Sequence, residues 1–246
     1  MKKNKEQKVR LGVNIDHIAT LRQVRGNTTS YPDLIHLMKE TIRGGADQIT
    51  IHLREDRRHI KDVDVVKVCR ESSVDVNLEM ACTEEMTRIA LKNNPEWVCI
   101  VPEKRAELTT EGGLDLFRVE RSLAKLIDKV QPRGIEVSLF LDPDLKQVQK
   151  AFELGADAIE FHTGKWVLLK EARKKQKEFE RLKQAASLCD DLGMRVHAGH
   201  GLDFEHTKKI LEIKSLKELN IGHSIICYSL GWGLRETVSR FKKILS

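Results

Sequence analysis

The chain has 246 residues, of which 40% are hydrophobic and 33% charged, so its composition is that of a globular protein with a sizeable core. Much of its net charge of +6 lies in the N-terminal tail and in 170–183, where glutamates alternate with the bases as on a solvated helix. Only three Trp and two Tyr are present, none within a basic stripe, so we expect no nucleic-acid binding. An anionic small-molecule substrate explains the excess positive charge equally well.

Segments that would route the chain out of the cell or into a membrane are absent from the sequence. No apolar stretch approaches the roughly 18 residues of a membrane span, and no apolar signal segment follows the charged N-terminus. We therefore expect a cytoplasmic protein without membrane contact. The five cysteines are scattered, which argues against a disulfide framework or a zinc cluster.

Short β-type runs alternate with longer runs of helical period along the chain, without a linker between them. We predict eight strands, at 10–15, 47–53, 74–80, 97–102, 135–141, 158–163, 194–199 and 218–223. Apolar residues recur at three- and four-residue spacing at 32–45, 83–94, 114–130, 144–155 and 204–214. Glycines that would end helices just before the next strand stand at 44, 45, 155 and 193.

Eight strand–helix units in a chain of this length predict the α/β class and a single (β/α)8 TIM barrel. We expect one domain over 1–246, with a short charged tail at 1–8. A doubly wound open sheet is the alternative, but "VNIDHIATLRQVRG" lacks the glycine-rich fingerprint that usually follows its first strand. In a barrel the active site lies at the carboxyl ends of the strands, so residues there are the candidates.

Ionisable and polar residues gather at the predicted strand ends. They are Asn14, Asp16, His17, His52, Arg54, Glu79, Glu103, Lys104, Glu160, His162, Thr163, His197, His200 and His223. A single histidine at a strand end is usually structural, whereas this many on one rim predict proton-transfer chemistry. Glu79 stands in the otherwise apolar "VNLEMA", where desolvation would raise its pKa toward the range of acid–base catalysis. A buried carboxylate paired with an arginine or an amide is the other interpretation.

Two regions could bind anions. "AGHGL" and "NIGHS" place Gly201 and Gly222 at strand-to-helix turns after the last two strands, where barrel enzymes commonly bind phosphate. These glycines could instead serve only the turns. Arginines in the loops expected after the first two strands offer a second site, although not all of them can face a pocket: Arg22, Arg25, Arg54, Arg57 and Arg58. The segment 108–115, "LTTEGGLD", suits either a mobile lid or a plain surface loop.

Several strings are more specific than the fold. They occur in order from about Leu11 to the C-terminal helix and include "GVNIDHIATLRQVRG", "ITIHLREDRRHI", "NLEMACTEEM", "VPEKRAELTTEGGLD", "IEFHTG", "AGHGL" and "LNIGHSII". Together they strongly resemble the pyridoxine 5'-phosphate synthase family. The resemblance implies an enzyme of vitamin B6 synthesis with neither cofactor nor metal, assembled as a homo-octamer. Its substrates would be 1-deoxy-D-xylulose 5-phosphate and 3-amino-2-oxopropyl phosphate, which condense to pyridoxine 5'-phosphate.

The same resemblance implies roles for individual residues. His52 and Glu79 would be proton acceptors, and His200 a proton donor. The aminoketone phosphate would be held by Asn14, Arg25, Gly201, Gly222 and His223. The deoxyxylulose phosphate would be held by Asp16, His17, Arg54, His59 and Thr109.

The chain departs from the family pattern at three positions. A small residue and an arginine usually stand where this chain has Cys227 and Tyr228, and loss of that arginine could loosen the phosphate site. His197 stands where asparagine is common and would add a titratable group near His200.

Three other functions remain open from the residues alone. A Schiff-base aldolase would use Lys165, which follows the sixth strand in an expected loop, where its pKa would be hard to depress. A metal-dependent isomerase or hydrolase would need clustered histidines, and no H-x-H or H-x-x-x-H pattern occurs. A phosphate-binding protein without catalysis would have no use for Glu79 in an apolar strand.

Overall fold

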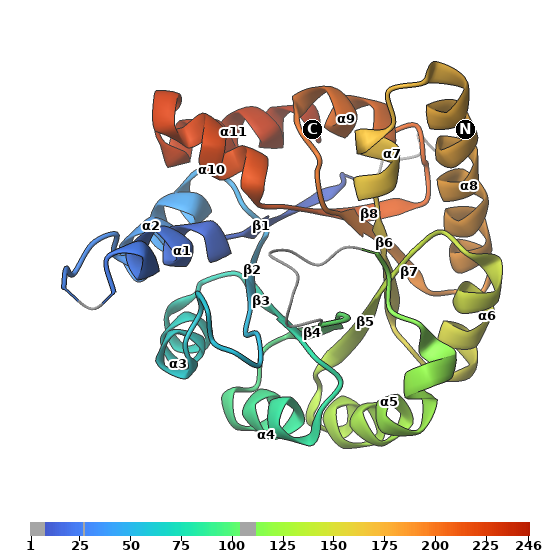
Figure 1. Ribbon diagram of the computed structural model, residues 1–246, viewed down its shortest axis with the longest axis horizontal. Coiled ribbons are helices and arrows are strands. Elements are labelled where there is room, and N and C mark those ends of the chain that lie inside the picture. The colour runs from blue at the N-terminus through green and yellow to red at the C-terminus, as the bar shows by residue number, and fades with distance from the viewer. Residues whose placement is uncertain (1–7, 27, 104–111) are drawn as a thin grey trace, which may run out of the picture.

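Eight parallel strands close into one barrel in chain order in the computed structural model, which describes residues 8–26, 28–103 and 112–246 (Figure 1). The strands are β1 (Arg10–Asn14), β2 (Gln48–His52), β3 (Asp75–Met80), β4 (Trp97–Ile100), β5 (Glu136–Leu141), β6 (Ala158–His162), β7 (Arg195–Gly199) and β8 (Leu216–Ile221). Each of them overlaps a predicted strand. The predicted fold, a single (β/α)8 TIM barrel, is therefore confirmed.

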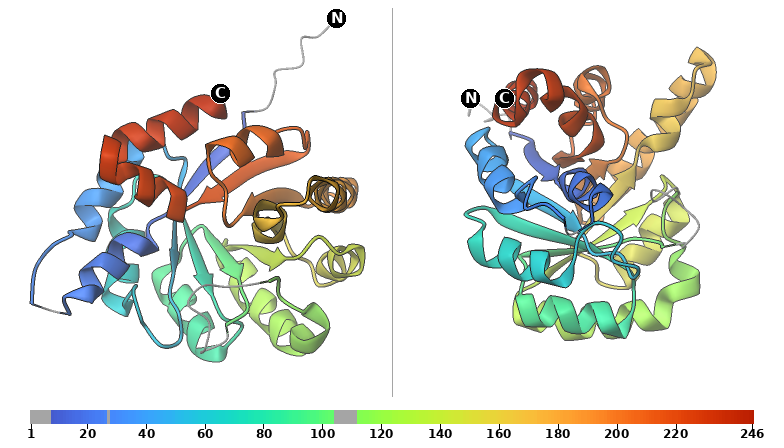
Figure 2. Two further views of the ribbon diagram at one scale, coloured as in Figure 1. Left: turned by 45° about the horizontal axis from the view of Figure 1, so that its top comes forward. Right: turned by 60° about the vertical axis from the view of Figure 1, so that its left-hand side comes forward.

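Helices surround the barrel, one after each strand (Figure 1). The covering helices are α2 (Leu34–Arg43), α3 (Asp62–Glu71), α4 (Glu84–Asn93), α5 (Leu116–Val130), α6 (Leu145–Glu153), α8 (Ala172–Asp191), α9 (Phe204–Ile210) and α11 (Leu234–Ile244). A 3-10 turn, η1 (Gln131–Arg133), follows α5. Helix α11 packs beside α2, so the end of the chain closes the ring next to its first covering helix (Figures 1 and 2).

Three further helices lie between a strand end and its covering helix: α1 (Asp16–Val24), α7 (Gly164–Leu168) and α10 (His223–Trp232). The sequence predicts a loop after the first strand, and this prediction is wrong for Asp16–Val24, which form helix α1. Asn14 Oδ1 accepts a hydrogen bond from the Asp16 amide at 2.9 Å, so a polar side chain satisfies one free amide at the helix start. Arg22 lies on this helix and binds Asp64 at 2.6 and 2.8 Å, so it is not the anion ligand considered from the sequence.

The two faces of the strands differ sharply in polarity. Ile49, Ile51 and Leu53, on one parity of β2 and just after it, are fully buried in the apolar layer under the helices. Gln48, Thr50 and His52 stand on the other parity, which faces the barrel axis. Polar residues from strands that are not adjacent meet there, since Thr50 Oγ1 on β2 donates to Asn220 Oδ1 on β8 at 3.1 Å. Barrel interiors are usually filled by aliphatic layers, so this polar axis is a particular feature of the chain.

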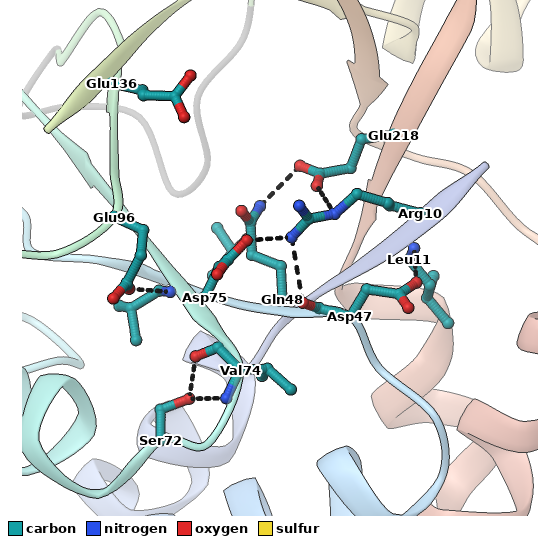
Figure 3. A network of polar contacts seen from close by, with 12 residues as sticks. Arg10, Leu11, Asp47, Gln48, Ser72, Val74, Asp75, Glu96, Glu136 and Glu218 are labelled. Carbon is teal, nitrogen blue, oxygen red and sulfur yellow. Dashed lines mark hydrogen bonds and ion pairs between the residues drawn. The ribbon is translucent and has the colours of Figure 1, made fainter. Parts of the chain in front are cut away.

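A charged network closes the amino end of the barrel (Figure 3). The guanidinium of Arg10 lies 2.5 Å from Asp75 Oδ2 and 3.1 Å from Glu218 Oε2, and it donates to the Asp47 carbonyl at 3.2 Å. Gln48 Nε2 donates to the other oxygen of Glu218 at 2.7 Å. Burial raises the pKa of Glu218 to about 7 despite its arginine partner. The network joins β1, β2, β3 and β8 below the site.

Candidate active site

A cavity of about 700 Å³ opens at the carboxyl ends of the strands. Its lining comes from every part of the rim: Asn14, Asp16, His17, Thr20, His52, Arg54, Arg58, His59, Glu79, Val101, Phe140, Glu160, His200, Gly201, Asn220, Gly222 and His223. Every predicted site residue lines it except Arg25 and Thr109. Arg25 is exposed just after α1, and Thr109 lies outside the described residues. The segment 108–115 also lies partly outside them, so its interpretation as a lid stays a prediction.

His52 is held on three sides. Its backbone amide donates to Asp16 Oδ1 at 2.8 Å, which joins the start of α1 to the end of β2. Its ring nitrogens face two carboxyl groups: Nε2 lies 2.9 Å from Glu103 Oε1, and Nδ1 lies 3.8 Å from Glu79 Oε2. The ring is 6% exposed, so it has little freedom to turn.

Glu79 lies next to His52 because the two are paired in register between β2 and β3. Burial is the largest cause that raises its pKa well above the ordinary value, and the carboxyl groups of Glu160 and Asp16 raise it further. A hydrogen bond with Asn14 acts in the opposite direction. Burial and the two neighbouring carboxyl groups therefore favour the protonated form of Glu79 in the substrate-free protein.

Glu160 lies on β6 with its carboxyl group at the floor of the cavity. Asn220 Nδ2 donates to its Oε2 at 2.7 Å, and Cys99 Sγ lies 3.9 Å from the same oxygen. Burial raises the pKa of Glu160 to about 8. Glu79 and Glu160 are therefore two carboxyl groups in one cavity whose protonated forms burial favours.

His200 follows β7 in a left-handed backbone conformation, with φ of 76°. The hydroxyl of Thr163 donates to its carbonyl at 2.6 Å and so fixes this turn. The ring packs edge-on against His162 and Phe140, with centroids 5.0 and 6.4 Å away. Burial, followed by the neighbouring histidines, lowers the pKa of His200 to about 4, so it is neutral at physiological pH in the substrate-free protein.

Histidines and an arginine face the cavity from the neighbouring loops. The rings of His17 and His223 meet edge-on at 5.1 Å, and burial lowers the pKa of His17. Burial also lowers the pKa of His59, whose ring lies 6.2 Å from that of His52. Arg54 is 3% exposed and remains within 4.0 Å of Asp56. The region therefore carries one buried guanidinium and several histidines that can gain charge when an anion enters.

The two glycines of the expected phosphate cradle occupy tight positions. Gly201 has φ of 79°, a conformation that side chains disfavour. A Cβ on Gly222 would lie 3.0 Å from Asn14 Cβ, so a side chain there would press on Asn14, whose Oδ1 accepts from the first amide of α1. Gly222 also caps the N-terminus of α10, whose first amides favour negative charge.

One group of residues in the described part of the chain could hold a metal ion, namely Asp16, His52 and Glu79. Their ligand atoms lie within 4.8 Å of one another. Spacing along the sequence does not reveal this group, because each member comes from a different strand end. Two of these side chains already have other polar partners, since Asp16 Oδ2 accepts from Asn14 Nδ2 at 2.9 Å and His52 Nε2 lies 2.9 Å from Glu103 Oε1.

Several residues of the site were not assigned a role from the sequence. The sequence places Glu103, Glu160 and His162 at strand ends without a predicted role, and it singles out neither Asp142 nor Asn220. His162 Nδ1 lies 3.0 Å from Asp142 Oδ1, which couples the ring beside His200 to the end of β5. Polar residues at the end of each strand are the signal that would have found them.

Other basic residues lie outside the cavity. Lys165 is on helix α7 rather than in a loop, is 58% exposed, and pairs with Glu178 at 3.0 Å. Arg57 binds Asp62 at 3.1 Å and also pairs with Glu85, as a surface ion pair would.

The three departures from the family pattern do not line the cavity. Tyr228 stacks on Trp232 with centroids 5.3 Å apart, and Cys227 Sγ lies 3.5 Å from His223 Nε2. His197 packs against Trp97, with centroids 5.2 Å apart. Burial lowers the pKa of His197 to about 3, so this residue stays neutral instead of adding a charge.

Fold and cavity together define a class: an enzyme of the (β/α)8 barrel type, with acid–base groups at the carboxyl ends of its strands. Residues 11–246 match the model of a family described as "Pyridoxal phosphate biosynthesis protein PdxJ". The chain belongs to this family.

Curated relatives agree over nearly the full length. The chain is 55% identical over 240 residues to the pyridoxine 5'-phosphate synthase of Bdellovibrio bacteriovorus, covering 98% of this chain and 99% of the relative. It is 48% identical over 236 residues to that of Pelagibacter ubique, covering 96% and 98%. The resemblance inferred from the sequence strings is thus confirmed.

A solved structure shares the fold at low identity. Orotidine 5'-monophosphate decarboxylase from Methanocaldococcus jannaschii, complexed with the inhibitor BMP, matches with a TM-score of 0.67 and 14% identity. The match covers 97% of this chain and 99% of the other. Among the described helices, none combines the length and the apolar character needed to cross a membrane.

Proposed function

We propose that this chain is a pyridoxine 5'-phosphate synthase. It condenses 1-deoxy-D-xylulose 5-phosphate with 3-amino-2-oxopropyl phosphate and releases pyridoxine 5'-phosphate, inorganic phosphate and two waters. The family match over residues 11–246 carries the proposal, together with relatives of that name at 48% and 55% identity. Imine formation, dehydration and phosphate loss each move protons, which suits a cavity lined by carboxyl groups and histidines.

In this reaction we assign His52 and Glu79 as proton acceptors and His200 as a proton donor. For these roles, protons must move among Glu79, His52 and His200 when the substrates bind. Before substrates enter, burial favours the protonated form of Glu79 and the neutral form of His200, because it disfavours the charged form of each. The negative charges of the two substrate phosphates favour a proton on His200. Glu79 can pass its own proton toward His52, whose Nδ1 lies 3.8 Å from Glu79 Oε2.

Two phosphorylated substrates need two anion sites. For the aminoketone phosphate we assign the N-terminus of α10 and its surroundings, with Asn14, Arg25, Gly201, Gly222 and His223. For the deoxyxylulose phosphate we assign the neighbouring part of the rim, after β1 and β2, with Asp16, His17, Arg54, His59 and Thr109. A buried guanidinium beside the cavity supports the second assignment. Holding both substrates in attack geometry supplies several kcal/mol of barrier reduction.

The reaction as proposed needs no cofactor or metal, because imine formation, carbon–carbon bond formation, dehydration and phosphate loss involve no net redox change and can be driven by proton transfers. We further propose that the enzyme acts in the cytoplasm as a homo-octamer, without nucleic-acid or membrane partners. The family resemblance supports the octamer.

The test is to mix the purified, chelator-treated protein with the two substrates and to measure both products. We expect pyridoxine 5'-phosphate and inorganic phosphate in equal amounts. Absence of both products, while each substrate still binds, would refute the activity and favour a binding protein. Borohydride trapping of a substrate on Lys165 would instead support the aldolase.

A further inference from the structure

Glu103 is a buried carboxylate directly behind a proposed catalytic histidine. Two residues separate it from the end of β4, and its side chain is 6% exposed. One oxygen, Oε1, lies 2.9 Å from His52 Nε2, and the other accepts a hydrogen bond from the Glu55 amide at 3.0 Å. Both oxygens are therefore fixed, one by the catalytic ring and one by the backbone after β2.

The charge state of Glu103 differs from that of Glu79 on the other side of the ring. Burial acts to raise the pKa of Glu103, but its hydrogen bond and charge interaction with His52 outweigh burial and leave this pKa lowered. Glu103 is thus ionised at neutral pH, whereas burial favours the protonated form of Glu79. An ionised acceptor at 2.9 Å places the ring proton of His52 on Nε2 and leaves Nδ1 unprotonated toward Glu79.

We propose that Glu103 is a positioning residue of the reaction, which rests on the proposed function. It fixes the tautomer of His52 and balances the imidazolium that forms when Nδ1 takes the proton of Glu79. In that step the O–H bond of Glu79 breaks and an N–H bond forms on His52. The carboxylate left on Glu79 then accepts a proton from a substrate.

Other charged groups around the pair act on its proton balance. Arg54 and Arg58 lie close enough to interact with the carboxylate of Glu103, and both favour its ionised form. Asp16 accepts from the backbone of His52, and His59 faces its ring at 6.2 Å. Of these groups Glu103 alone has a carboxylate oxygen within 3 Å of a nitrogen of the His52 ring, so removing its charge should affect His52 most directly.

The test compares Glu103→Gln with the wild type. Glutamine can still accept from Nε2 but cannot balance an imidazolium, so we expect kcat to fall about a hundredfold or more. KM for either substrate should change less than about threefold, since Glu103 does not line the cavity. The acid limb of the kcat profile should move to lower pH. Glu84→Gln, an exposed glutamate on α4 that pairs with Lys129, is the matched control.

A second readout does not depend on turnover. In 15N-histidine NMR spectra of the substrate-free wild type, His52 should carry its proton on Nε2, and Glu103→Gln should weaken this preference for one tautomer. Glu103→Asp keeps the charge, and its kcat should be at least tenfold higher than that of Glu103→Gln. Wild-type kcat in Glu103→Gln, or equal losses in both variants, would overturn the role. An inactive wild type would instead refute the proposed function, while the NMR result would still decide the tautomer.

Discussion

Asn220 Nδ2 donates a hydrogen bond to Glu160 Oε2 at 2.7 Å, and both side chains are almost completely buried in the polar axis of the barrel. The pKa of Glu160 is raised from an ordinary value of 4.5 to about 8, with burial as the largest cause. Between these two values the folded protein keeps a proton that the unfolded chain releases. This group therefore makes the free energy of unfolding fall as the pH rises through that window.

Glu160→Gln should remove this pH dependence. At pH 5 the variant and the wild type should have similar free energies of unfolding, because both carry a neutral side chain there. At pH 8.5 the variant should be more stable by roughly 1 to 3 kcal/mol. Denaturant titrations at the two pH values measure the difference, with Glu84→Gln as an exposed control. An equal difference at both pH values would contradict the buried, protonated state of Glu160.

Anion binding should be coupled to proton uptake. Burial lowers the pKa of His17, His59 and His200, so all three are largely neutral in the empty cavity at pH 7.5. A phosphate dianion favours their protonated forms, so its binding should raise these pKa values and draw protons from the buffer. Calorimetry with inorganic phosphate or a phosphorylated substrate, in buffers of different ionisation enthalpy, measures the number of protons. Binding without proton uptake between pH 6 and 8 would contradict this expectation.

Most of the fold could be predicted because each signal was local. Alternation at Ile49, Ile51 and Leu53 marked β2, and glycines marked the ends of helices before the next strand. The loop predicted after the first strand is instead helix α1, which has only nine residues and no side-chain cap at Ile15, so neither a long period nor a capping residue marks it in the sequence. The sequence predicts a loop at Lys165 instead of helix α7, because this helix has only five residues, too few for a helical period to appear.

The candidate site was predictable in its membership but not in its contacts. The positions at strand ends and the family resemblance predict His52, Glu79 and His200 as site residues. The structure places all three around one cavity. The contact of Glu103 with His52 joins strand ends 51 residues apart in sequence, and only closure of the barrel reveals it. Proton positions depend in the same way on burial, which no spacing along the chain encodes.

Asp142→Asn should slow the reaction by acting through His162. The carboxylate lies 3.0 Å from His162 Nδ1, and the His162 ring packs against His200 at 5.0 Å. Half of the Asp142 side chain is exposed, so solvent weakens the interaction, and we expect kcat to fall about threefold to tenfold. Steady-state kinetics measure this, with Asp62→Asn as a surface control that leaves Arg57 paired with Glu85. A kcat equal to that of the wild type would show that His162 needs no carboxylate.

Metal removal tests how the group formed by Asp16, His52 and Glu79 is used. Their ligand atoms lie within 4.8 Å of one another, so they can serve either proton transfer or cation binding, but not both at once. Because the proposed reaction uses these atoms for protons, chelator treatment should leave kcat unchanged. Excess Zn²⁺ should lower it, since the ion would displace the protons of Glu79 and His52. Loss of activity in chelator, restored by one added divalent metal, would mean that the group is a metal site and that the assigned acid–base roles are wrong.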